Sequence, residues 1–307
     1  MLRRLFLWCS ESDWLADTLP DLPFVRRSVK RFVPGEGLDD AVAAGDRLRE
    51  AGISVVLTRL GEHVHTEEAA AEVTEHYLEV LGRVAGRPGD TEISVKLTQM
   101  GLEQSTDRAR ENLSRLCAAA AGTGRTVWVD MESSEYVDRT LEVYRSVLAE
   151  HGDVGICLQA YLRRAARDLE DVLERGGSVR LVKGAYDEPA DVAFPDKREV
   201  DENFVALATR LLEDVRDRGG RQAIATHDLA LVGRVREAAS ASGVPADAYE
   251  IQMLYGIQAE AQRRLASEGH RVRTLISYGA EWFAWYMRRL AERPANVLFV
   301  LRNLVGG

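Results

Sequence analysis

The sequence predicts an α/β protein, a (β/α)8 barrel of the TIM type preceded by an N-terminal helical lead-in. Eight short apolar runs rich in β-branched residues recur along the chain, and helical patterns fill the gaps between them. No GxGxxG fingerprint follows the first run, which disfavours the alternative of an open doubly wound sheet. We expect an irregular or helical segment over residues 1–35 and a catalytic barrel domain over residues 36–307.

The lead-in comes first and is punctuated by Pro20, Pro23 and Pro34. The predicted strands come next, and several are apolar at both odd and even positions. That pattern is typical of strands buried on both faces, as in a parallel barrel. The predicted strands are 53–60, 92–98, 126–132, 154–160, 178–185, 222–228, 249–255 and 272–277.

Helical periodicity is clearest in two of the segments between strands, where apolar residues recur at intervals of three and four. Glycine often lies between a helical pattern and the next strand, as in AGISVV, which is the usual end of a helix before a strand. The two apolar faces consist of Val137, Leu141, Tyr144 and Leu148, and of Phe204, Leu207, Leu211 and Val215.

Composition narrows the class of protein. The chain has 40 Lys and Arg against 49 Asp and Glu, a net charge of −9, which argues against an extended nucleic-acid surface but allows a local anion site. Cys9, Cys117 and Cys157 are far apart and form no CxxC, so we expect free thiols. The apolar run 5–8 is too short for a signal peptide, and no run is long enough to span a membrane. We therefore expect a cytoplasmic protein.

Polar residues stand at most of the predicted strand ends, where barrels of this kind carry their chemistry. Taken singly, each has a structural alternative: a paired lysine in a polar barrel layer, an aspartate that caps a helix, or a hydrogen-bonded histidine. Taken together, the cations among them predict a focused pocket for phosphates or a carboxylate. The set comprises Arg59, Glu62, Lys96, Asp130, Glu132, Gln159, Arg163, Arg164, Arg180, Lys183, Tyr186, Thr226, His227, Asp228, Gln252 and Tyr255. In KGAY, we expect the small residues to allow close approach of a flat ligand.

Two further motifs leave alternatives open. His63 and His65 could form a metal pair, but no third ligand is near in the sequence, so we expect a loop and no metal site. In WYMRRLAE, Glu292 lies one helical turn beyond Arg288 and Arg289 and can pair with both. This arrangement is either a surface ladder of charges or a bidentate site for a small carboxylate.

Six segments in order resemble the proline dehydrogenase family: SVKLTQMG, VWVDME, RLVKGAYDEP, ATHD, EIQMLYGI and WYMRRLAERPANVLFVLRNL. The resemblance runs from about residue 30 to the C-terminus. It implies a (β/α)8 barrel with non-covalent FAD that oxidises L-proline to 1-pyrroline-5-carboxylate and passes electrons to a quinone. Quinone reduction in turn implies transient contact with the inner face of a membrane.

The resemblance also implies site residues. Arg288 and Arg289 match the arginines that bind the proline carboxylate, and Glu292 matches the glutamate that supports them. The family's other positions near the substrate correspond in this chain to Lys96, Asp130, Tyr186 and the apolar Leu254. The implied FAD-binding residues are Asp130, Met131, Gln159, Arg180, Lys183, Gly184, Ala185, Tyr186, Thr226, His227 and Gln252.

Two positions of the expected substrate pocket depart from the family pattern. Trp285 stands where a tyrosine is usual, and Leu275 stands where an aromatic residue is usual. The same chemistry on hydroxyproline is therefore an alternative. From the residues alone, two other classes stay open: an aldolase-type lyase with a Schiff base on Lys96 or Lys183, and a non-catalytic binding barrel.

Overall fold

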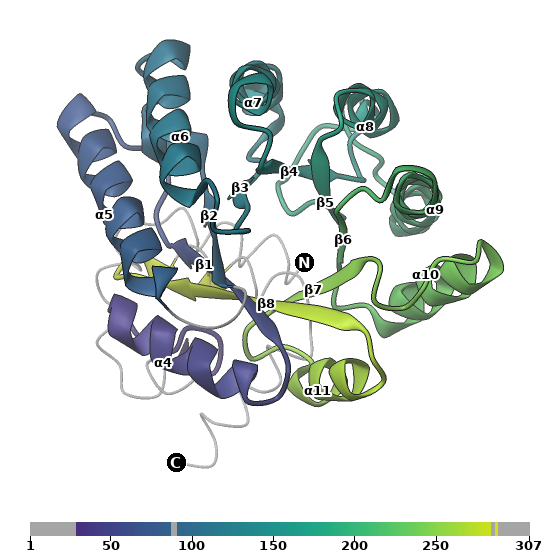
Figure 1. Cartoon of the computed structure of the whole chain (residues 1–307). Coiled ribbons are helices and arrows are strands. Elements are labelled where there is room, and N and C mark those ends of the chain that lie inside the picture. The colour runs from purple at the N-terminus through teal and green to yellow at the C-terminus, as the bar shows by residue number, and fades with distance from the viewer. Residues whose placement is uncertain (1–28, 87–90, 284–285, 288–307) are drawn as a thin grey trace.

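The computed structural model describes residues 29–86, 91–283 and 286–287, and in them eight parallel strands close into a barrel in sequence order (Figure 1). The predicted fold class is confirmed. Arg288, Arg289, Glu292 and Trp285 lie outside the described residues. The strands are β1 (Ser54–Arg59), β2 (Thr91–Val95), β3 (Val127–Val129), β4 (Val154–Gln159), β5 (Ser178–Val182), β6 (Gln222–Ala225), β7 (Glu250–Leu254) and β8 (Arg271–Tyr278).

All eight predicted strands are present, but several end earlier than predicted. The predicted strand 92–98 stops at Val95, and its last two residues belong to the 3-10 helix η2 (Leu97–Met100). Gly101 ends this turn with a φ of 93°, a conformation that favours glycine. Strand β3 also ends before Met131, and β6 before Thr226. These residues are apolar or β-branched, but they lie past the rim of the barrel, where the ladder with the neighbouring strands ends.

Helices surround the barrel and cover the outer face of its strands (Figure 1). Within the described ranges, no helix combines the length and the apolar character needed to cross a membrane. The helices that surround the barrel are α4 (Leu38–Arg49), α5 (Glu67–Ala85), α6 (Thr106–Ala120), α7 (Val137–His151), α8 (Ala165–Glu174), α9 (Lys197–Arg218), α10 (Leu229–Ala241) and α11 (Ala259–Ser267). A second 3-10 helix, η3 (Ser134–Tyr136), precedes α7.

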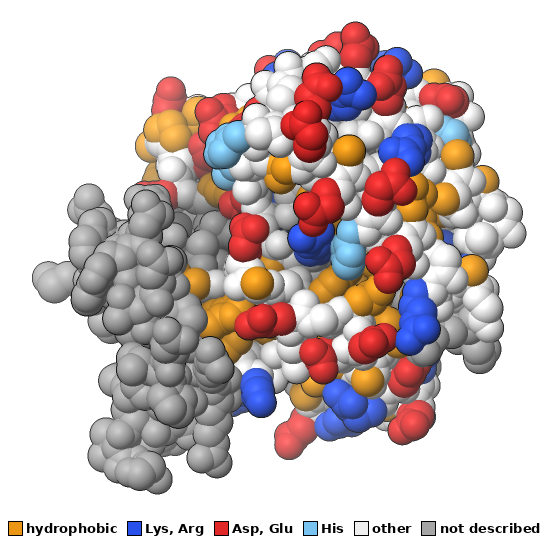
Figure 2. Space-filling model, turned by 90° about the vertical axis from the view of Figure 1, so that its left-hand side faces the viewer, with side chains coloured by type: hydrophobic (Ala, Val, Ile, Leu, Met, Phe, Trp, Pro, Cys, Tyr) orange, Lys and Arg blue, Asp and Glu red, His pale blue; other side chains and the backbone are white. Residues whose placement is uncertain are grey.

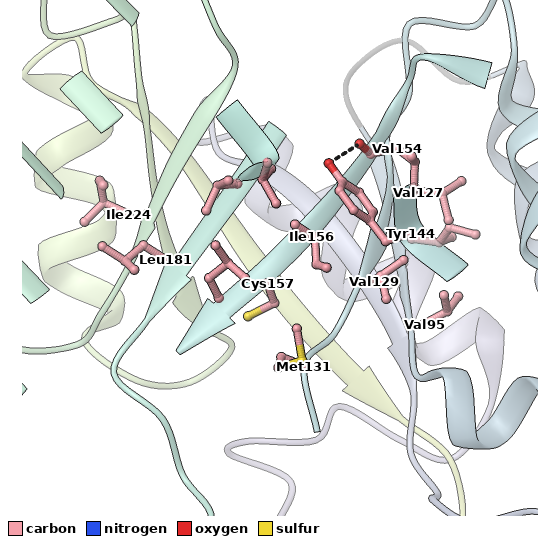
Figure 3. Close-up of a cluster of buried hydrophobic side chains, with 14 of the residues drawn as sticks. Val95, Val127, Val129, Met131, Tyr144, Val154, Ile156, Cys157, Leu181 and Ile224 are labelled. Carbon is pink, nitrogen blue, oxygen red and sulfur yellow. Dashed lines mark hydrogen bonds between the residues drawn. The ribbon is translucent and has the colours of Figure 1, made fainter. Parts of the chain in front are cut away.

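The main core lies between the strands and this ring of helices. Val129 and Ile156 are fully buried there, and Tyr144 of α7 packs beside them and donates a hydrogen bond to the carbonyl of Val154 over 3.4 Å (Figure 3). A smaller apolar layer that includes Trp128 fills the barrel interior. The strands are therefore buried on both faces, which explains why they are apolar at both odd and even positions.

A buried ion network forms the floor of the barrel, at the N-terminal ends of the strands. The side chain of Arg273 is fully buried, with Nε 2.8 Å from Glu250 Oε1 and Nη1 3.4 Å from Glu92 Oε2. Arg221 Nη1 lies 2.6 Å from Glu92 Oε1. Burial alone would raise the pKa of Glu250, but the nearby guanidinium of Arg273 lowers it to about 2. Each buried charge thus has a partner that offsets its cost of desolvation.

Charges on the outside of the molecule are mixed. Figure 2 shows acidic and basic side chains interspersed over the described part of one face of the molecule. Many of these charges pair between neighbouring helices, as Arg210 of α9 does with Glu170 of α8 over 2.8 Å. Such exposed pairs contribute at most about 1 kcal/mol each, so the ionic interactions with large energetic consequences are those inside the barrel.

Candidate active site

A cavity of about 770 Å³ opens at the C-terminal ends of the strands. Its volume lies in the range of about 300–1,000 Å³ that is typical of small-molecule and cofactor sites. Every substrate or cofactor position that the family resemblance implies within the described ranges lines this cavity. These residues are Lys96, Asp130, Met131, Gln159, Arg180, Lys183, Gly184, Ala185, Tyr186, Thr226, His227, Gln252, Leu254 and Leu275.

Asp130 links three strands at the base of the cavity. Its Oδ1 accepts hydrogen bonds from Ser94 Oγ over 2.7 Å and from Arg180 Nη1 over 2.9 Å. Its Oδ2 lies 3.8 Å from Lys96 Nζ. Burial alone would lower the pKa of Lys96, but the Asp130 carboxylate, aided by Glu62, outweighs this effect and raises it. Lys96 therefore carries its charge at neutral pH.

Three buried residues of the cavity wall keep polar atoms without a hydrogen-bond partner in the described protein. Arg180 stacks over Trp128 at 4.8 Å and bonds through Nη1, while its Nε and Nη2 are unpaired. Gln159 donates through Nε2 to the carbonyls of Met131 and Glu132, which leaves Oε1 unpaired. Gln252 donates to Glu250 over 2.5 Å and also leaves Oε1 unpaired.

Leaving such groups unsatisfied costs about 1–3 kcal/mol each. The arrangement therefore suits a polar ligand that receives hydrogen bonds from a guanidinium and donates hydrogen bonds to amide oxygens. Ser94, which holds both Asp130 and Arg180, was not among the predicted site residues. Its signal in the sequence was its position two residues before Lys96, which places both side chains on the inner face of one strand.

The prediction that cationic side chains dominate the cavity is wrong in part. Lys183 Nζ lies 2.5 Å from Asp201 Oδ1 and 3.5 Å from Asp228 Oδ2, so two carboxylates offset its charge. Lys197 at the start of α9 joins the same cluster through Asp201. Asp228 also caps α10 by accepting from the backbone N–H of Ala230 over 3.2 Å, as the structural alternative predicted.

Arg163 and Arg164 do not line the cavity at all. The guanidinium of Arg163 stacks on Phe194 at 4.8 Å. Arg164 forms ion pairs with Asp138 and Asp168 on the helices outside the barrel. Both arginines lie past the end of β4, in a turn that carries their side chains away from the barrel axis.

His227 is a hydrogen-bonded histidine, as its structural alternative predicted. Its Nε2 accepts from the backbone N–H of Leu254 over 2.9 Å, so that nitrogen carries no proton. This bond ties the end of β6 to the end of β7. Cys157 also lines the cavity, but burial raises its pKa to about 12, which keeps it a neutral thiol.

The structure explains why position 184 is a glycine, and the reason differs from the one that we expected. Its φ is 114°, and a Cβ on it would lie 2.2 Å from Cδ1 of Tyr161. Glycine is therefore required by the backbone conformation and by the tyrosine ring beneath it. Close approach of a ligand is not needed to explain this residue.

The histidines of HVH lie in the loop after β1, as expected. Their nearest acidic partner is Glu103, with Oε1 2.7 Å from His63 Nδ1 and Oε2 3.6 Å from His65 Nδ1. Among the described residues, no group of three or more His, Cys, Asp or Glu side chains is arranged to hold a metal ion.

A parallel (β/α)8 barrel with a lined cavity at the C-terminal ends of its strands defines the class of barrel enzymes. A family model described as proline dehydrogenase matches residues 41–302. Proline dehydrogenase 1 of Bacillus subtilis subsp. natto is 37% identical over 305 residues, which cover 99% of this chain and 99% of that protein. The chain belongs to the proline dehydrogenase family and is an oxidoreductase of proline catabolism.

Two further relatives agree. Proline dehydrogenase of Deinococcus radiodurans is 36% identical over 283 residues, 91% of this chain and 90% of that protein. Among solved structures, proline utilization A (PutA) from Bdellovibrio bacteriovorus, inactivated by N-propargylglycine, has a TM-score of 0.81 at 25% identity. The match covers 95% of this chain but only 36% of that longer protein.

Proposed function

We propose that this enzyme oxidises L-proline to 1-pyrroline-5-carboxylate with non-covalent FAD held in the cavity, and that a quinone receives the electrons. One observation carries the cofactor proposal. Three buried residues of the cavity wall, Arg180, Gln159 and Gln252, keep unpaired hydrogen-bonding atoms. Native proteins seldom leave such atoms unsatisfied, so water or a ligand must complete them, and in a cavity of this size a polar ligand can do so.

The residues present fit a flavin. Its ring system carries carbonyl oxygens, ring nitrogens that accept hydrogen bonds and an imide N–H, which match guanidinium donors and amide acceptors. Arg180 would stabilise negative charge on that ring system. Lys183, Thr226 and His227 line the same cavity and would hold other parts of the cofactor. When bound, FAD supplies the acceptor for the hydride that proline loses.

The protein would mainly orient the substrate. We assign the proline carboxylate to Arg288 and Arg289, with Glu292 as their support, because paired guanidinium groups bind carboxylates bidentately. Tyr186 and the apolar Leu254 would contact the ring. Fixing the substrate in this way supplies much of the catalysis that a hydride transfer requires.

The charged pair at the base of the cavity would tune the substrate. Proline must lose its amine proton before hydride transfer, because the nitrogen lone pair drives the loss of hydride. Lys96 remains protonated and cannot accept that proton. We therefore give Lys96 and Asp130 the role of positioning and electrostatic tuning, and no role as a general base.

Exchange of electrons with a quinone requires approach to a membrane, because quinones of respiratory chains dissolve in lipid. We propose that the enzyme is cytoplasmic and makes transient contact with the inner face of the membrane. Preference between proline and hydroxyproline would depend on Leu275 and Trp285. Leu275 lines the cavity and offers no hydrogen-bonding group to a substrate hydroxyl, which favours the unsubstituted ring.

Purified protein tests the cofactor. It should show flavin absorbance, and denaturation should release FAD into the supernatant. Arg180→Met should weaken FAD binding by about tenfold or more, since hydrogen bonds to charged groups contribute about 1.5–3 kcal/mol. Arg175→Met, on the exposed end of α8, is the matched control. Equal FAD affinity of the two variants would remove Arg180 from the cofactor site.

Steady-state kinetics with an artificial acceptor tests the substrate. L-proline should be oxidised faster than trans-4-hydroxy-L-proline at equal concentration. Arg288→Met and Arg289→Met should each raise KM for proline by about a hundredfold while FAD stays bound, because an unpaired buried carboxylate is costly. An unchanged KM in both variants would exclude the carboxylate assignment.

A further inference from the structure

The short 3-10 helix η3 (Ser134–Tyr136) stands between two loops that border the cavity. On one side it contacts the loop between β5 and α9, which carries the cavity residues Gly184 and Tyr186. On the other side it contacts the loop between β2 and α6 through Glu103. Neither contact involves a residue that the proposed reaction uses.

The first contact is a bidentate one from Glu188, two residues after Tyr186. Glu188 Oε1 accepts from the backbone N–H of Ser134 over 2.7 Å, and Oε2 accepts from the Ser134 hydroxyl over 2.5 Å. The N-cap residue Ser133 makes no side-chain capping bond, and its hydroxyl donates to Glu135 over 3.1 Å. Glu188 therefore caps the start of η3 from another loop and compensates for the missing local cap.

The rest of the β5–α9 loop is fixed to the loop after β4. The backbone N–H of Phe194 donates to the carbonyl of Tyr161 over 2.8 Å, and that of Arg163 donates to Val192 over 3.0 Å. The Tyr161 ring also packs beneath Gly184. Glu188 adds a second attachment, to the turn after β3, so the stretch that carries Tyr186 is held by the loops after β3 and β4.

The second contact continues toward β1. The Tyr136 hydroxyl donates to Glu103 Oε1 over 2.7 Å, and the same oxygen lies 2.7 Å from His63 Nδ1. His63 has a φ of 58°, an uncommon conformation for a residue with a side chain. The residue before it, Glu62, lines the cavity. Hydrogen bonds therefore connect four loops, after β1, β2, β3 and β5, around the mouth of the cavity.

We propose that η3 is a positioning element of the reaction, and that Glu188 and Tyr136 are positioning residues that hold the loop of Tyr186 and the loop of Glu62 in one arrangement. The inference rests on the proposed role of Tyr186 at the substrate. Without Glu188, the loop that carries Tyr186 can adopt other arrangements. The apparent affinity for the substrate then falls in proportion to the fraction of molecules in which this loop has the arrangement that binds substrate.

A double-mutant cycle tests this role. Glu188→Gln keeps the size of the side chain but removes one acceptor, and should raise KM for proline about tenfold with kcat and FAD content near wild type. In a Tyr186→Ala background, the same substitution should change KM by less than about twofold, because the residue through which it acts is gone. Tyr136→Phe, which deletes only the hydroxyl, should raise KM in the same direction.

Glu135→Gln is the matched control, since this carboxylate lies on the same turn, is exposed and accepts from the hydroxyl of its near neighbour Ser133. A merely structural role for Glu188 would lower the melting temperature and raise KM equally in both backgrounds, which would overturn the inference. If Glu188→Gln leaves KM unchanged while Tyr186→Ala raises it, this inference is wrong and the proposed role of Tyr186 stands. If Tyr186→Ala leaves KM unchanged, both this inference and the proposed role of Tyr186 are wrong.

Discussion

The ammonium group of Lys96 lies 3.8 Å from the carboxylate of Asp130, at the adjoining ends of two neighbouring strands. The two residues come from segments that the sequence separates by a whole helix, and the barrel brings them together. Asp130 also receives the guanidinium of Arg180, so one carboxylate faces two cations. This cluster keeps Lys96 charged, which disfavours a Schiff base on this lysine.

A lyase with a Schiff base needs a neutral lysine, whereas Lys96 has a pKa raised above its usual 10.5. We expect no covalent adduct on Lys96 after the protein is mixed with a small aldehyde or ketone and treated with borohydride. Mass spectrometry of the digested protein checks this. A reduced adduct on Lys96 would show that this lysine reacts as a neutral amine and would contradict its assignment as a charged positioning residue.

The floor of the barrel should be sensitive to loss of a single charge. Arg273→Met leaves Glu250 and Glu92 buried without their central partner, and should lower the free energy of unfolding by about 3–5 kcal/mol. Arg175→Met removes an exposed pair with Asp171 and should cost at most about 1 kcal/mol. Urea unfolding curves measure both values, and equal losses would contradict the energetic role of the floor network.

The same floor predicts a pH dependence of stability. The pKa of Glu250 is about 2 in the folded protein, below its ordinary value of 4.5. Its ionisation therefore stabilises the folded state above about pH 4.5, and this contribution is lost as the pH falls from about 4.5 toward 2. Glu250→Gln should flatten the fall of the unfolding free energy in that window. A variant with the wild-type slope would show that other carboxylates determine the acid sensitivity.

Two glycines should respond oppositely to alanine. Gly184→Ala places a methyl group against the Tyr161 ring at a φ of 114°, and should destabilise the protein by about 1–3 kcal/mol and disturb the cavity wall. Gly233→Ala, inside α10 with no atom near the added methyl group, should be neutral or stabilise by up to about 1 kcal/mol. Thermal melts separate the two, and a melting temperature of Gly184→Ala at or above that of Gly233→Ala would contradict this explanation.

The linear order of residues sufficed to predict the barrel and several members of the cavity wall. Each strand carries its own apolar pattern, and a barrel places every strand end at one rim. Lys96, Asp130, Arg180 and Gln252 could therefore be assigned to one cavity without knowing any distance. The residues just past a strand end were harder to predict, as Leu97 and Thr98 show, because a 3-10 turn and a strand accept similar residues.

Only the tertiary structure decided how the charges pair. Arg273 pairs with Glu92, which is far away in the chain, and Lys183 pairs with Asp201 and Asp228 near the starts of two different helices. Arg163 and Arg164 look like pocket cations in the sequence, yet their turn directs them outward. The sequence by itself determined which residues reach the rim, because local periodicity sets the strands. Pairing depends on distances between segments, and those distances exist only once the barrel has closed.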